Sequence, residues 1–346
     1  MNIFLRAVLK MLELLKKFCN IDAPSGSEEA MREAIIEEIA GLCEYRVDAL
    51  GSIIAFKRGK SRSSKKVMLD AHMDEVGIML TGIKDEGFLS FTTVGGIEET
   101  ALVGSRVKIN GLTGVIALTP VHLLTSSQRE KKVSSDELYI DIGANSREDA
   151  QKYVSIGDTG TFENSFRQMG DIIKSKALDN RIGCALLVDI IKSETEYDMY
   201  FTFTVQEEVG LRGAAAAAFS VAPDYAIILE GTTAADIPGV DAPNNVCRVG
   251  NGPAVSFMDR ATLYDREMYN EAFKTAKEMG IVCQPKSLAS GGNNAGSIQK
   301  AGSGVRCIAV NVPVRYLHSP SSMASINDIE NAGKLAKAIA EKYAAK

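Results

Sequence analysis

Hydrophobic residues recur with two different spacings along this chain. From about residue 167 to the C-terminus, short apolar runs of strand length alternate with longer stretches that have helical periodicity. The strand-like runs are MYFTFTVQ, DYAIILEG and VRCIAVNVPV, and the helical stretches include RIGCALLVDIIK, LRGAAAAAFS, DREMYNEAFKTAKEMG and SINDIENAGKLAKAIAEKYA. Strands that alternate with helices predict a mostly parallel sheet covered by helices on both faces.

The N-terminal part carries the same kind of pattern. MNIFLRAVLKMLELLKKFC places apolar residues at helical spacing among Lys and Arg, and it lacks the continuous apolar segment of a signal peptide. We therefore predict an amphipathic helix there. Ser25 and Glu28 have the spacing of a capping box for a second helix over MREAIIEEIA. GSIIAFK and KVMLDAHMD are the next predicted strands.

The middle of the chain has a different pattern of apolar residues. Between residues 76 and 166, short β-like runs such as GFLSFTTVGG and GSRVKINGLTGVIALT alternate with glycine-rich turns, and the only helical stretch is brief. This pattern is typical of a compact all-β insertion, such as a small barrel. The sequence thus predicts one α/β domain, formed by residues 1–75 and 167–346, that is interrupted by a β-rich domain of residues 76–166.

The composition argues against some classes of binding partner. The 346 residues carry a formal net charge of −5, so we expect neither nucleic acid nor an anionic membrane as a partner. No apolar run approaches the roughly 18 residues of a membrane span. The six cysteines form no CxxC pair and several lie in apolar runs, which favours buried, reduced thiols in the cytoplasm.

Residues that could bind a metal or take part in catalysis occur at the ends of the predicted core elements. In open α/β sheets, ligands bind beyond the carboxyl ends of the strands. Each candidate alone also has an ordinary structural explanation, such as a helix N-cap for Asp179 or a solvated turn for paired glutamates. The residues at these positions are His72, Asp179, Glu207, Glu208, Glu230 and His318.

As a set, these residues are harder to explain structurally. Two histidines and three carboxylates match the ligands of a pair of borderline metal ions such as zinc, cobalt or manganese. One carboxylate can bridge two ions, while one histidine and one further carboxylate complete each half-site. A fourth carboxylate then remains free to act as a base. The sequence alone does not show that these residues converge.

Six segments, in this order, give the chain a family resemblance. They are MLELLKKFCNIDAPSGSEE, AHMDEVGIML, ALDNRIGCALL, VQEEVGLRGA, LEGTTAADIPG and RYLHSP. The chain resembles the tetrahedral (TET) metallo-aminopeptidases, the group that includes glutamyl and deblocking aminopeptidases and proteins labelled cellulase M. The resemblance covers nearly the whole chain after about Met11.

The resemblance implies a role for each of seven residues. Five would hold two divalent metal ions per subunit: His72 and Glu230 on one ion, Glu208 and His318 on the other, and Asp179 bridging both. Asp74 would orient the imidazole of His72, as metal-bound histidines usually require. Glu207 would be the general base that takes a proton from water and returns it to the leaving amine.

The resemblance also implies a fold, a substrate and an assembly. The fold would be a zinc-peptidase-like α/β sandwich whose inserted small β-barrel makes dimer contacts, with dimers building a dodecamer. The substrates would be short peptides, cleaved from the N-terminus. Two positions depart from the family pattern, because many relatives have Asp in place of Glu230 and of Asn294. Asn294 removes a possible negative charge near the site, which keeps the metal ligands intact and leaves the substrate preference open. We interpret His122 as a structural or inter-subunit residue.

Three other functions stay open at this stage. A metal-dependent carboxypeptidase or deacylase on the related fold would bind a carboxylate of its substrate through an arginine near the metals. Arg315 or Arg181 in the pocket would therefore favour this function. An endoglucanase, as the cellulase label suggests, needs two carboxylates around a sugar ring and normally no metal pair, and the histidines argue against it. A non-catalytic shell protein would not be expected to keep the complete set of residues.

Overall fold

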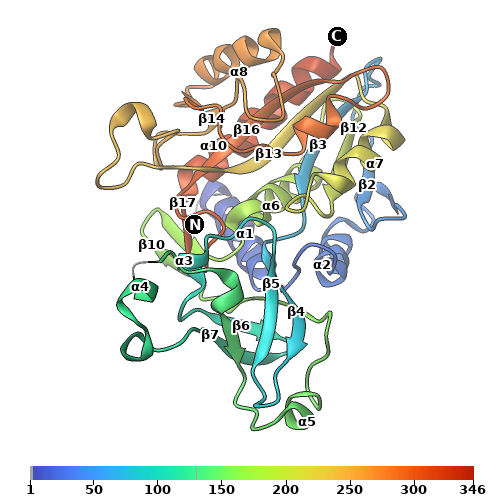
Figure 1. Ribbon diagram of the computed structural model, residues 1–346. Coiled ribbons are helices and arrows are strands. Elements are labelled where there is room, and N and C mark those ends of the chain that lie inside the picture. The colour runs from blue at the N-terminus through green and yellow to red at the C-terminus, as the bar shows by residue number, and fades with distance from the viewer. Residues whose placement is uncertain (1–2, 130) are drawn as a thin grey trace.

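The predicted strands outside the middle segment form one twisted sheet (Figure 1). The computed structural model describes residues 3–129 and 131–346. In spatial order, the strands of the sheet are β1 (Glu44–Val47), β2 (Ile53–Lys57), β12 (Met199–Thr204), β3 (Val67–His72), β13 (Tyr225–Thr233), β16 (Arg306–Val314), β14 (Ala254–Val255) and β15 (Gln284–Pro285). The four central strands β12, β3, β13 and β16 are mutually parallel, which confirms the predicted mostly parallel sheet.

Helices cover both faces of this sheet, as the alternating pattern predicts. α6 and α10 pack against β3, β13 and each other, and α1 and α2 lie behind α6. On the opposite face, α7 contacts β12 and α9, and α9 contacts β13 and β16. The helices are α1 (Ile3–Cys19), α2 (Glu29–Ile39), α6 (Leu178–Lys192), α7 (Arg212–Val221), α8 (Arg266–Glu278), α9 (Ala295–Ile298) and α10 (Ile326–Ala344), with the short η3 (Ala242–Asn244).

The middle segment forms a closed barrel, as its texture predicts (Figure 1). Its strands follow the order β4 (Gly77–Ile83), β5 (Leu89–Val94), β8 (Tyr139–Asp141), β7 (Leu112–Ala117), β6 (Arg106–Ile109) and β9 (Thr159–Phe162), and β9 pairs with β4 to close the ring. Ile78, Ile109 and Ile140 belong to a buried cluster separate from that of the α/β part. The barrel therefore has a hydrophobic core of its own.

Short elements connect or flank these two parts. The helical turns in the middle segment are α3 (Glu99–Leu102), η1 (Val121–Leu123), α4 (Ser126–Arg129), η2 (Ser135–Glu137) and α5 (Arg147–Ala150). His122 is exposed on η1. A small sheet of β10 (Arg167–Met169), β11 (Ile172–Ser175) and β17 (Ser322–Ser325) follows the barrel.

A buried charge cluster joins the barrel to the α/β part. Lys176 Nζ lies 3.0 Å from Glu75 Oε1 and 2.8 Å from Asp22 Oδ1. Arg181 Nη2 also lies 3.0 Å from Glu75 Oε1, and Thr161 of β9 donates to Asp22. Buried charges persist when they are paired and hydrogen-bonded in this way. The cluster fixes the segment that leads into α6.

The predicted capping box is wrong. α2 begins at Glu29, and the Glu28 side chain instead accepts hydrogen bonds from the backbone N–H groups of Gly26 and Gln206. Ser25 Oγ donates to Asp74 Oδ2 at 2.6 Å. Both side chains have partners distant in sequence, and a bond to a buried carboxylate is stronger than a neutral cap bond. This segment therefore supports the residues after β3 and β12.

The structure also bears on two features considered from composition, the cysteines and membrane-spanning helices. The six cysteines, all in the described part of the chain, carry free thiols, and four of them are buried. Within residues 3–129 and 131–346, no helix is both long and apolar enough to cross a membrane.

Candidate metal centre

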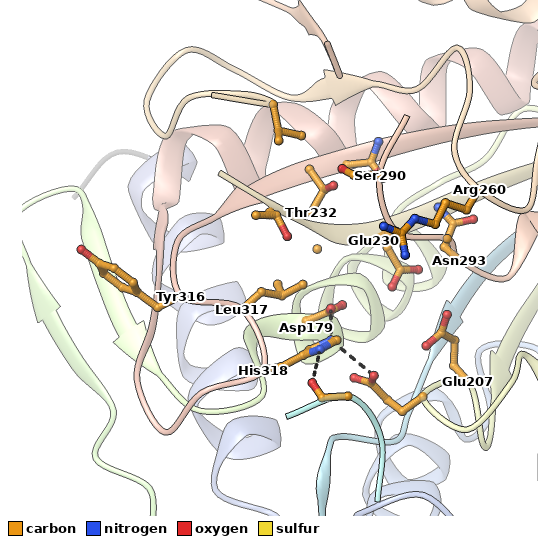
Figure 2. A pocket seen from close by; sticks show the side chains of 18 of the residues that line it. Asp179, Glu207, Glu230, Thr232, Arg260, Ser290, Asn293, Tyr316, Leu317 and His318 are labelled. Atoms are coloured by element: carbon orange, nitrogen blue, oxygen red, sulfur yellow. Dashed lines mark hydrogen bonds and ion pairs between the residues drawn. The ribbon is translucent and has the colours of Figure 1, made fainter. Parts of the chain in front are cut away.

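The six candidate residues converge at the carboxyl ends of the central strands. Figure 2 shows four of them, Asp179, Glu207, Glu230 and His318. His72 is the last residue of β3, and Glu207 and Glu208 follow β12. The prediction that Glu230 ends its strand is wrong, because β13 pairs with β16 as far as Thr233. Pairing of β13 with β3 stops earlier, at Ile228. The side of β13 beyond that point is open, and Glu230 faces His72 there.

His72 is fully buried, and each of its two ring nitrogens faces oxygen atoms. Its Nδ1 lies 3.0 Å from the carbonyl oxygen of Asp74 and 3.4 Å from Asp74 Oδ1. Its Nε2 lies 3.0 Å from Glu230 Oε1 and 3.4 Å from Asp179 Oδ1. A bond from Nδ1–H to the Asp74 carbonyl leaves the Nε2 lone pair directed at the carboxylates. That is the tautomer a metal ligand needs.

His318 has the same arrangement from a different part of the chain. Its backbone φ is 55°, in the left-handed region. Nδ1 lies 2.8 Å from the carbonyl oxygen of Gly96, in the loop that follows β5 of the barrel. Nε2 lies 3.3 Å from Glu208 Oε2 and 3.5 Å from Asp179 Oδ2, as the dashed lines of Figure 2 show. The barrel thus orients one histidine of the site.

Asp179 lies between the two histidines. Its Oδ1 faces His72 and its Oδ2 faces His318. The ordinary explanation of Asp179 as an N-cap does not hold, because Asn180 Oδ1 instead accepts the N–H of Gly183 at 3.0 Å. The Asp179–Asn180 peptide bond is cis, and neither residue has helical φ/ψ. The first turn of α6 therefore presents Asp179 to the site and leaves capping to its neighbour.

Asp74 anchors the two adjacent glutamates. Its Oδ1 accepts the backbone N–H of Glu207 at 3.0 Å, and its Oδ2 accepts that of Glu208 at 3.1 Å. The two side chains then diverge. Glu207 Oε2 lies 3.9 Å from Nε2 of His72, whereas Glu208 is next to His318. Neighbouring residues can consequently serve different parts of the site.

Burial of several ionisable carboxylates in this cluster costs free energy unless a cation compensates their charge. Burial raises the pKa of Glu208 to about 8, and the nearby Asp179 charge adds to the rise while His318 opposes it. Burial likewise raises the pKa of Glu207 and Glu230 well above the usual range. For His318, burial acts to lower the pKa, but the bond to Asp179 and the charge of Glu208 outweigh it and raise the pKa to about 9.

Three carboxylate oxygens in the cluster lack a hydrogen-bond partner in the described part of the chain. They are Asp179 Oδ1, Glu208 Oε1 and Glu230 Oε2, and all three are buried. Buried polar atoms are normally paired, so unpaired oxygens at one place require an explanation. A divalent cation would complete their coordination and compensate their charge. The residues therefore fit a metal centre.

Possible ligand atoms fall into three overlapping groups, within which they lie no more than 4.8 Å apart. One group is His72, Asp179 and Glu230, and a second is Asp179, Glu208 and His318. Asp179 belongs to both. The third group combines His72 with Glu207 and Glu208. Each group offers the nitrogen and oxygen ligands that borderline divalent metals accept.

The centre opens into a cleft of about 960 Å³, whose walls include Glu207, Glu230 and His318. Two basic residues that the sequence analysis did not single out, Arg260 and Lys286, also line it. Arg260 lies between β14 and α8, and Lys286 lies between β15 and α9, in irregular segments where no periodic pattern marks them. A single Lys or Arg in a loop gives no local signal of function.

The arginines expected for a carboxypeptidase or deacylase lie elsewhere. Arg315 Nε is 2.7 Å from Asp236 Oδ1, and Arg181 is fully buried against Glu75. Neither lines the cleft. Asn294 is not in the cleft wall either, because it is buried beneath the site, where its Nδ2 donates to Asp70 at 2.7 Å. Its neighbour Asn293 lines the cleft instead.

The comparisons with known proteins agree with this geometry. The M42 glutamyl aminopeptidase family matches residues 51–335. A relative from Acetivibrio thermocellus, which carries the provisional name of an aminopeptidase, is 46% identical over 94% of this chain and 97% of its own. The chain belongs to the M42 peptidase family. It is therefore a peptide hydrolase of the aminopeptidase class.

Solved structures of other peptidases superpose over nearly the whole chain. An aminopeptidase from the archaeon Desulfurococcus kamchatkensis has a TM-score of 0.92 and 32% identity, covering 97% of this chain and 95% of its own. The TET1 peptidase of Pyrococcus horikoshii, with a TM-score of 0.84 and 36% identity over 95% of this chain and 99% of its own, assembles into a tetrahedron or a large octahedral shell. These likenesses confirm the family resemblance and the zinc-peptidase-like fold with its inserted barrel.

Proposed function

We propose that this M42 peptidase removes N-terminal residues from short peptides at a centre of two divalent metal ions, with Glu207 as the general base. The observation that carries the proposal is the position of Asp179. Its two oxygens face two different histidines, and each histidine has a further carboxylate of its own. His72 and Glu230 would hold one ion, His318 and Glu208 the other, and Asp179 would bridge them.

Zinc, cobalt and manganese suit this mixed nitrogen and oxygen set. Bound ions of this kind supply a Lewis acid for the scissile carbonyl and an activated water as nucleophile. Glu207 lines the cleft without belonging to either group that contains Asp179. We assign to its carboxylate the removal of a proton from the attacking water and the delivery of that proton to the leaving amine.

Cleavage at the N-terminus is tested with one peptide in three forms. The free peptide should lose residues one at a time from its N-terminus, and amidation of its C-terminus should change the rate little. N-acetylation should slow cleavage sharply, because an amide nitrogen offers neither a lone pair nor a positive charge to the site. Mass spectrometry of the products decides the direction. Equal hydrolysis of the free and acetylated forms, or loss of residues from the C-terminus, would instead support the deacylase or carboxypeptidase function.

We also propose that the chain forms a homo-oligomer, a dodecamer built from dimers through the domain of residues 76–166. The support is the assembly of the Pyrococcus horikoshii relative into closed shells. Light scattering should give a native mass well above the 37.2 kDa of one chain. A chain that stays monomeric at every concentration, with and without added metal, would contradict this prediction.

A further inference from the structure

The residues on both sides of Asp179 are bound to a single oxygen atom, Oε1 of Glu75. Lys176 precedes Asp179 in the chain, and Arg181 follows it. Lys176 Nζ and Arg181 Nη2 each lie 3.0 Å from this oxygen, which also accepts the backbone N–H of Ala23 at 3.1 Å. The side chains of Glu75, Lys176 and Arg181 are all buried. Because charge-assisted hydrogen bonds are strong in such surroundings, Glu75 holds both ends of the segment that carries Asp179.

Arg181 depends on Glu75 more than Lys176 does. In the described part of the chain, Glu75 is the only carboxylate within ion-pair distance of Arg181. Arg181 Nη2 also donates to a backbone carbonyl at 3.2 Å, whereas its Nε and Nη1 have no hydrogen-bond partner among the described residues. Lys176 keeps a second anionic partner, Asp22, at 2.8 Å. Loss of the Glu75 charge therefore leaves Arg181, but not Lys176, without a counter-ion.

The carboxylate of Asp179 is positioned by its backbone. Its Oδ1 has no hydrogen-bond partner in the described part of the chain. The turn that carries it is irregular, because Ala177 has a left-handed φ of 54° and Asp179 lacks helical φ/ψ. Asn180 Nδ2 holds the turn to β13 by donating to a backbone carbonyl at 2.8 Å. The N–H of Arg181 donates to the carbonyl of Ala177 at 3.1 Å, so a shift of Arg181 is transmitted to Asp179.

Glu75 is itself held next to the other half of the site. It directly follows Asp74, whose carbonyl oxygen lies 3.0 Å from Nδ1 of His72. The backbone N–H and carbonyl of Glu75 both hydrogen-bond to residues 23–25, at 3.1 and 3.2 Å. Glu75 thus connects the residues that orient His72 to the turn that carries Asp179.

We propose that Glu75 is a positioning residue of the metal centre, which fixes the place of the Asp179 carboxylate by binding Lys176 and Arg181. This inference rests on the proposed two-metal function, in which Asp179 bridges the ions. Glu75 does not line the cleft, so it acts through Asp179 rather than on the substrate. Neutralising Glu75 leaves every proposed metal ligand in the chain, but Arg181 becomes a buried charge without a counter-ion. The turn then shifts, and both half-sites lose the geometry of their shared ligand.

Glu75→Gln is the direct test, because glutamine keeps the length of the side chain and removes its charge. The dissociation constant for zinc, measured by competition with a chromophoric chelator, should rise by about 10- to 100-fold, the usual cost of losing a group that orients metal ligands. The visible absorption spectrum of the cobalt-loaded protein should also change, because it reports the geometry of the ligands around the ion.

Asp328→Asn is the matched control. Asp328 is also a fully buried carboxylate, its oxygens accept the backbone N–H groups of Gly250 and Gly252, and it belongs to none of the groups of possible metal ligands. This variant should lower the melting temperature of the metal-free protein. Its zinc affinity and cobalt spectrum should match those of the wild-type protein.

A double variant keeps the test decisive if the unpaired charge prevents Glu75→Gln from folding. Glu75→Gln combined with Lys176→Met removes one anion and one cation from the buried cluster, and it should show the same weakened zinc binding because Arg181 still lacks its partner. Wild-type zinc affinity and a wild-type cobalt spectrum in either variant would overturn the proposal and reduce Glu75 to a stabilising residue. A wild-type protein that does not bind two ions per subunit would instead contradict the proposed function, and this inference with it.

Discussion

Glu207→Gln should lower kcat by about 10²–10⁴-fold, the usual loss when a general base is removed, without loss of bound metal. Glutamine keeps the shape of the side chain but cannot accept and return a proton. The backbone at this position is held by Asp74 rather than by the Glu207 side chain. The local structure should therefore survive the change.

The control for this variant is the adjacent residue. Glu208 faces His318 and Asp179, so Glu208→Gln should lose metal as well as activity. Elemental analysis of both purified variants, together with their single-turnover rates, separates the two roles. A Glu207→Gln enzyme with a near-normal rate, or one with the metal deficit of Glu208→Gln, would show that the general base has been misassigned.

Complete removal of metal should abolish peptide hydrolysis, and cobalt, zinc or manganese should restore it. The physical reason is the cluster of buried carboxylate oxygens that have no hydrogen-bond partner in the described part of the chain, because a bound cation would compensate their charge. Metal that binds only the folded state should also raise the melting temperature.

A comparison of variants links this effect to the proposed ligands. Glu207→Gln should keep the metal-dependent rise in melting temperature, whereas Asp179→Asn, which weakens both half-sites at once, should lose most of it. Full activity of the wild-type protein after verified removal of all metal would refute the metal requirement.

From the sequence, the candidate residues could be placed at the ends of core elements. These ends lie close together because the carboxyl ends of neighbouring parallel strands meet at one edge of a sheet. His72 ends β3 and Glu207 follows β12, and these two strands are paired in parallel. Glu230 reached the site although its strand continues past it, because β3 ends while β13 still pairs with β16. A local apolar pattern shows where a buried run occurs, but it does not show how far the neighbouring strand extends.

Tertiary contacts account for what the sequence did not predict. Ser25 and Glu28 have the spacing of a capping box, yet both bond to groups far away in the chain. The sequence left the effect of Asn294 on substrate preference open, and the fold buries this residue beneath the site against Asp70. Lys286 lies in the wall of the cleft, and no periodic pattern in the sequence marks this position.

The most direct test of the two-metal centre is anomalous X-ray scattering from crystals of the metal-loaded enzyme. It counts the ions and identifies their ligands in one measurement. The proposal predicts two ions per subunit, one bound by His72 and Glu230, the other by Glu208 and His318, with Asp179 in contact with both. A single fully occupied ion, or two ions of which Asp179 contacts only one, would contradict it.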